Sequence, residues 1–185
     1  MAVKWKPDVK DKGELTVFND AGAWKAAVET AMKTFNASGF GVKLIAGKNA
    51  NSANVEVRLS EGSSTFDFYD QTWPVNFDAA APHGKTLPFV DPDKNVLIKA
   101  AVFLPSKLES MSNEVKVIVT VHEFIHAAGL HQNTDHDDDS GVFYARFNIV
   151  NGKLLEILPN KGAKPMPPVR FGPKTVSKLR NLWKK

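Results

Sequence analysis

Two histidines and a glutamate in the centre of the chain have the spacing of a metal-binding helix. The segment reads His122-Glu123-Phe124-Ile125-His126. Residues four positions apart lie on one face of a helix, so both imidazoles can bind one metal ion, with the carboxylate of Glu123 beside them. Imidazole nitrogen suits zinc, which lowers the pKa of a bound water to about 7. Glu123 can remove a proton from that water as it attacks a carbonyl carbon, then pass the proton to the leaving amine.

The residues after this segment resemble the metzincin family of zinc proteases. Gly129 follows His126 by three positions, which matches the start of the metzincin motif HExxHxxGxxH. Metzincins also have a methionine turn below the metal, and Met166 stands in the corresponding place along the chain. In its small size the chain is similar to matrixins and snapalysins. The resemblance implies an α+β fold: a mixed twisted sheet with backing helices, an active-site helix and a C-terminal subdomain.

The chain departs from that motif at the third metal ligand. Gln132 stands where the family has histidine, and glutamine is a poor zinc ligand. His131 follows Gly129 too closely to reach the metal without a changed turn. A longer polar loop can return His136 to the metal, and Asp135-His136 resembles the Asp-His pair that ends the snapalysin motif. We therefore expect His136 to complete the zinc site, with His131 as the alternative third ligand and Asp135 as a weaker candidate.

Apolar patterns before the motif predict the scaffold that positions it. Ala23–Phe35 has apolar residues at helical spacing, and the active-site helix is expected from near Ser112 to Ala128. Three segments are expected to be strands: Val42–Ala46, Asn54–Leu59 and Val96–Leu104. The resemblance makes Val96–Leu104 the edge strand of the sheet and places the substrate cleft between this strand and the metal. Residues 60–95 are rich in Gly, Pro, Asp and Ser, and we expect an irregular loop or cleft wall there.

Two signals follow the motif. Val142–Val150 and Lys153–Leu158 flank Asn151-Gly152, the residue pair of a tight hairpin turn. Pro173 can begin a closing helix, whose apolar stripe ends at Trp183.

Length and composition favour one globular domain. The chain has 185 residues, of which 43% are hydrophobic and 24% charged. We expect a single catalytic domain over residues 1–185, with an upper subdomain at about 15–129 and a lower one at about 130–185. The absence of cysteine excludes disulfides, a thiolate nucleophile and cysteine-ligated zinc.

Charge and hydropathy limit the partners and leave the compartment open. A net charge of +4 is weak support for nucleic-acid binding, and we expect none. No apolar run approaches the roughly 18 residues of a membrane span. The first residues lack the apolar segment of a signal peptide, although a mature secreted chain with an added Met would look the same.

These patterns lead to the expectation of a monomeric zinc endopeptidase that acts on proteins or peptides. The alternatives are a catalytically impaired binding or structural module of the same fold, and a zinc amidase acting on a non-peptide amide. Glu123 favours an enzyme, because a purely structural zinc site has no use for a general base. The acidic run Asp137–Asp139 could bind calcium, but a solvated loop is the simpler interpretation.

Overall fold

A computed structural model describes residues 2–108, 111–131, 135–136, 147–150, 153–158, 162–165 and 169–184. Its centre is a five-stranded mixed sheet in the order β2-β1-β3-β7-β6. Strands β1, β2, β3 and β7 are parallel, and β6 pairs antiparallel with β7 at the edge. The strands are β1 (Glu14–Asp20), β2 (Lys43–Ala46), β3 (Val55–Ser60), β6 (Lys85–Asp91) and β7 (Val96–Pro105). The expected α+β class is therefore confirmed, with a mixed sheet and helices.

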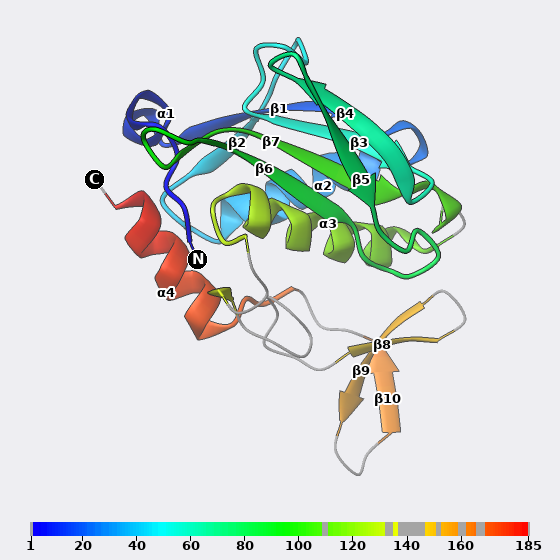
Figure 1. Ribbon diagram of the computed structural model, residues 1–185. Coiled ribbons are helices and arrows are strands. Elements are labelled where there is room, and N and C mark those ends of the chain that lie inside the picture. The colour runs from blue at the N-terminus through cyan, green and yellow to red at the C-terminus, as the bar shows by residue number, and fades with distance from the viewer. Residues whose placement is uncertain are drawn as a thin grey trace.

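Two long helices cover one face of this sheet (Figure 1). They are α2 (Lys25–Ala37), preceded by a short 3-10 helix (Gly22–Trp24), and α3 (Asn113–Ala127). Phe35 of α2 and Phe124 of α3 meet edge to face, with ring centroids 6.5 Å apart. Both rings are fully buried, so the two helices share one apolar core with the sheet.

A hairpin covers the opposite face of the sheet beside β6 and β7. It consists of β4 (Ser63–Phe68) and β5 (Gln71–Asn76), and Phe66 packs edge to face against Phe103 of β7. Side chains along β7 alternate between the two cores: Ala100 and Val102 face the helices, whereas Ala101 and Phe103 face the hairpin. Burial of both faces explains why β7 is a continuous apolar run.

The remaining elements lie before and after this body. The short helix α1 (Pro7–Lys12) and a 3-10 turn (Ser106–Leu108) flank the sheet in sequence. Below the helices in Figure 1 lies a separate antiparallel sheet in the order β10-β9-β8. Its strands are β8 (Phe147–Val150), β9 (Lys153–Leu158) and β10 (Gly162–Pro165), and α4 (Pro173–Trp183) ends the fold. The division into upper and lower subdomains stays a prediction.

The structure confirms some expected elements and corrects others. The two helices, the three strands, the β8–β9 pairing and the closing helix are all present. The expected irregular loop over residues 60–95 is wrong, because this segment contains β4, β5 and β6, although part of it does form a cavity wall. Val96–Leu104 is a strand but an inner one, and β6 is the edge strand instead. Pro74 and Pro88 interrupt the strand pattern of this segment, and both are tolerated because β5 and β6 lie at sheet edges.

Candidate metal site

The helix that carries the motif is held at its first turn by a side-chain cap. Ser112 is the N-cap residue, and its hydroxyl oxygen accepts a hydrogen bond from the backbone N–H of Val115 at 3.4 Å. The apolar, β-branched sequence that follows suits a helix packed against a sheet on one side and α2 on the other. Glu123 and His126 are buried in this helix, with 4% and 7% of their surface exposed. Side chains buried to this extent need specific polar partners.

Groups from both ends of the chain bind the last carbonyls of α3. Trp5 Nε1 donates to the oxygen of Ala127 and Trp183 Nε1 to that of Ala128, both at 3.0 Å. The backbone N–H of Val3 donates to Gly129 O, also at 3.0 Å. These bonds satisfy carbonyls that a helix end leaves without an intrahelical partner. The helix end is therefore fixed by long-range contacts.

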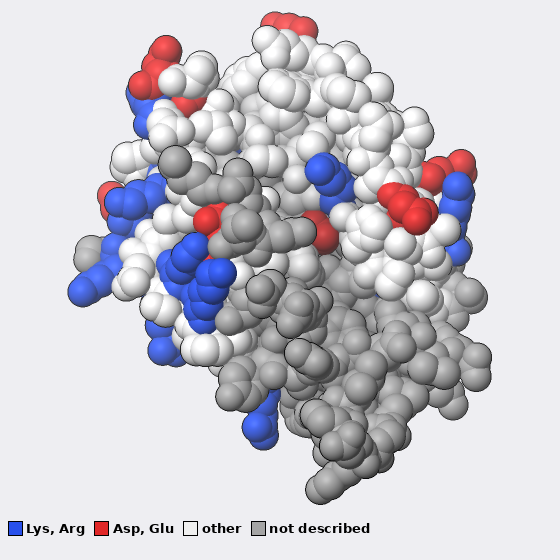
Figure 2. All heavy atoms as spheres, turned by 60° about the horizontal axis from the view of Figure 1, so that its bottom comes forward, with Lys and Arg blue, Asp and Glu red and all other residues white. Residues whose placement is uncertain are grey.

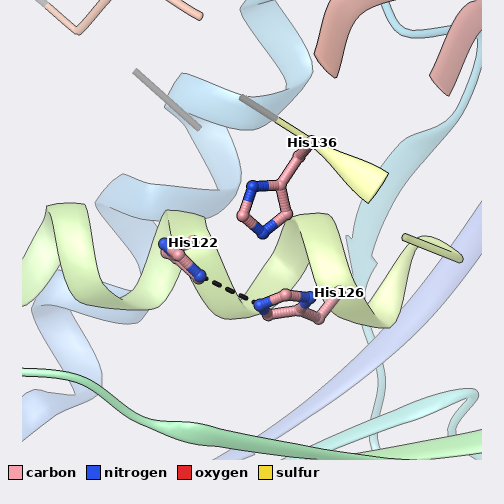
Figure 3. Close-up of side chains that lie close together, drawn as sticks. All are labelled: His122, His126 and His136. Carbon is pink, nitrogen blue, oxygen red and sulfur yellow. Dashed lines mark hydrogen bonds between the residues drawn. The ribbon is translucent and has the colours of Figure 1, made fainter. Parts of the chain in front are cut away.

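Three histidines converge beside α3, and we call them the three-histidine group: His122, His126 and His136 (Figure 3). One ring nitrogen of each lies within 4.8 Å of the others. The Nε2 atoms of His122 and His126 are 2.9 Å apart. Ligands about 2.0–2.1 Å from a tetrahedral zinc ion lie about 3.4 Å from one another, so a small outward movement would accommodate the ion. These residues could hold a metal ion.

The backbone determines which nitrogen of His126 faces the group. Its Nδ1 donates a hydrogen bond to the carbonyl oxygen of Leu130 at 2.5 Å. A carbonyl can only accept, so the proton is on Nδ1 and the lone pair of Nε2 faces His122. This is the arrangement in which imidazole binds a metal, with the other ring nitrogen held by a neighbouring carbonyl.

Burial favours the neutral imidazole form of His122 and His126. It lowers the pKa of His122 from 6.5 to about 3, assisted by the nearby rings of His126, His136 and His83. The pKa of His126 is also lowered by burial, which its bond to Leu130 partly opposes. Neutral imidazole is the form that binds metal, so protons compete weakly for His122 near neutral pH.

His136 reaches the site from a separate segment anchored on α4. Asp135, directly before it, accepts a hydrogen bond from Lys178 Nζ at 3.3 Å. Lysine and arginine side chains gather on the side of the molecule where α4 lies (Figure 2). Asp135 therefore contacts α4 and is not in the three-histidine group. His136 faces α3 instead.

His131 takes a different place from His136. It lines the cavity beside His122 and His126 but is not a member of the three-histidine group. Burial lowers the pKa of His131 to about 4. Four other positions singled out from the sequence lie outside the described residues: Gln132, Met166, the turn Asn151-Gly152 and the acidic run Asp137–Asp139.

Glu123 extends from α3 toward the edge strand β6. The hydroxyl of Thr86 donates to its Oε2 at 2.7 Å. Burial raises the pKa of Glu123 from 4.5 to about 7, and hydrogen bonds from Thr86 and the Gly84 backbone act in the opposite direction. A carboxyl group with a pKa near 7 can both accept and return a proton at neutral pH.

An open cavity of about 550 Å³ is lined by His122, Glu123 and His126. Its walls come from α3, from the start of β6 and from the segment that connects β5 to β6. The lining includes His83, Gly84, Lys85 and Thr86 on one side and His122, Glu123 and His126 on the other. Gly84 and Thr86 were not predicted as site residues, because the sequence of β6 has no clear strand period. The volume is ordinary for a ligand-binding pocket.

Comparisons of the chain with protein-family models, with curated proteins and with solved structures found no match. Of the helices within the described residues, none has the length and apolar character needed to cross a bilayer.

Proposed function

We propose that this protein is a zinc-dependent endopeptidase in which Glu123 is the general base. The observation that carries the proposal is the grouping of three imidazole nitrogens near a buried carboxyl group, with His122, Glu123 and His126 lining a cavity open to solvent. Three protein ligands leave one position of a tetrahedral metal open, as catalytic zinc sites do and structural sites do not. The resemblance to metzincins at His122–Gly129 agrees with this proposal.

The donor set favours zinc over other common ions. Calcium and magnesium prefer carboxylate and carbonyl oxygens, whereas the three-histidine group supplies nitrogen only. When bound there, zinc supplies a Lewis acid that polarises the substrate carbonyl and lowers the pKa of water to about 7. The bond from His126 Nδ1 to Leu130 keeps that ring oriented for the metal.

The protein residues supply the proton transfers. Glu123 accepts a proton from the water that attacks the carbonyl carbon of the scissile bond. When the carbon–nitrogen bond breaks, Glu123 donates the proton to the leaving amine. Its raised pKa of about 7, caused by burial, suits both transfers at neutral pH.

The position of β6 suggests how a peptide would bind. This strand ends the described sheet and begins at the cavity wall, where Lys85 and Thr86 lie near α3. The free backbone groups of an edge strand can pair with an extended peptide. A peptide bound in this way would pass its backbone across the three-histidine group.

A metal analysis combined with a cleavage assay tests the proposal. The purified protein should contain about one zinc ion per chain and cleave some members of a panel of quenched fluorescent peptides. Removal of zinc with a chelator should abolish cleavage, and added zinc should restore it. Stoichiometric zinc without hydrolysis of any substrate would favour a catalytically impaired module, and cleavage of non-peptide amides alone would favour an amidase.

A further inference from the structure

We propose that Thr86 is a positioning residue that holds the carboxyl group of Glu123 in its reactive orientation. The proposal rests on the proposed function, because it assigns Thr86 a part in the same reaction. Thr86 lies 2.7 Å from Glu123 Oε2 through its Oγ1, and this hydroxyl is half-buried at the cavity wall.

The register of the sheet aims Thr86 at the active-site helix. Thr86 is paired with Val102 of β7, and Val102 belongs to the core between the sheet and the helices. Directly paired residues share a face of the sheet, so Thr86 also faces α3. The neighbouring Lys85 pairs with Phe103, which faces the hairpin. A slip of one residue would turn Thr86 away from Glu123, so the register itself determines the contact.

Gly84 allows β6 to approach the carboxyl group closely. A Cβ atom at this position would lie 2.8 Å from Glu123 Cγ and 2.7 Å from the carbonyl oxygen of Phe103. Only glycine fits without a shift of the backbone or of Glu123. The Gly84 backbone also hydrogen-bonds the carboxyl group. Thr86 of β6 and Gly84, directly before the strand, thus contact Glu123 from the cavity wall.

A side chain that transfers protons needs this kind of support. Glu123 has several rotatable bonds, and its carboxyl group would take other orientations without the bond from Thr86. A displacement of about 1 Å at a reacting group can lower a rate by about a hundredfold. Thr86 has no place in the three-histidine group, so loss of its hydroxyl should change proton transfer and leave the metal bound.

The test compares Thr86→Val, which keeps the shape and removes the hydroxyl, with Thr86→Ser, which keeps the hydroxyl. Both zinc-loaded variants are assayed on a peptide that the wild-type protein cleaves. We expect Thr86→Val to lower kcat about ten- to a hundredfold with KM within about twofold of the wild type. Thr86→Ser should recover the rate to within about threefold. Zinc content and melting temperature should be similar in all three proteins.

A second variant, Gly84→Ala, tests whether the orientation of the Glu123 carboxyl group controls the rate. Gly84→Ala should also lower kcat while Thr86 is intact, because the added Cβ displaces Glu123. Unchanged kcat in folded Thr86→Val, or equal losses in Thr86→Val and Thr86→Ser, would overturn the positioning role. A zinc-loaded wild-type protein that cleaves nothing would instead overturn the proposed function, and this proposal with it.

Discussion

His136 lies on a segment beyond the end of α3, yet its ring centroid is 5.0 Å from that of His126. Two features hold the rings together. Lys178 of α4 binds Asp135, which directly precedes His136, and the carbonyl of Leu130 orients the ring of His126. The geometry of the three-histidine group therefore depends on the contact of Asp135 with α4 as well as on the helix that carries the motif.

The third ligand can be tested by comparing His136→Ala with His131→Ala. We expect His136→Ala to weaken zinc binding by more than about a hundredfold, because it removes a metal ligand. His131→Ala should retain zinc, since His131 is not in the three-histidine group. Both affinities should be measured by chelator competition at one pH, because protons compete for imidazole. Loss of zinc from His131→Ala with retention in His136→Ala would reverse the assignment.

Glu123→Gln should separate metal binding from catalysis. The amide keeps the size of the side chain and cannot accept the proton, so hydrolysis should fall by about 10²- to 10⁴-fold. Zinc content should stay at the wild-type level, because Glu123 is not a member of the three-histidine group. A folded, zinc-loaded Glu123→Gln protein with wild-type kcat would contradict the proposed mechanism.

Gly129→Ala should destabilise the end of α3. Gly129 has a φ of +121°, and an added Cβ would lie 2.4 Å from Leu182 Cδ2 and 2.6 Å from Val3 O. Backbone strain and overpacking together should lower the free energy of unfolding by about 2–4 kcal/mol.

Gly39→Ala is the matched control for Gly129→Ala. Its φ is +64°, but the nearest atom to an added Cβ is 3.8 Å away, so only the backbone strain of about 1 kcal/mol applies. Urea denaturation of both variants gives the two values. Equal losses would mean that close packing at Gly129 adds nothing to the cost.

The half-buried imidazole of His122 should make the zinc-free protein less stable in acid. Its pKa in the folded state is lowered by burial to about 3, from 6.5. Below pH 6.5 the unfolded chain therefore binds a proton that the folded protein excludes until about pH 3. The contribution of His122 to stability should fall by about 1.4 kcal/mol for each unit of pH lost within this window.

The His122→Gln variant removes this contribution together with its coupling to the rings of His126 and His136, while the remaining titrating groups are common to both proteins. The free energy of unfolding should be measured by urea denaturation in the presence of a chelator. The difference, wild type minus variant, should increase from pH 4 to pH 6. A difference that does not change with pH would show that His122 titrates near its ordinary pKa in the folded protein.

The local features of this protein were predictable from sequence. Helical periodicity alone places His122 and His126 on one face of a helix, and Gly129 marks the end of that helix. The strands β3 and β7 were found because their apolar patterns reflect burial on the sheet. The edge strand β6 was missed, because an edge strand needs no continuous apolar run and can contain a proline such as Pro88.

The completion of the candidate site was decided only by the tertiary structure. The sequence favours His136 over His131 without excluding either, because a loop's path is set by contacts far away in the chain, here with Lys178. It contains no sign that Thr86 meets Glu123, since that contact depends on the register between β6 and β7. Residues that are neighbours on a helix lie three or four positions apart in the sequence. Strand pairing and loop closure bring together residues with no fixed separation in the sequence.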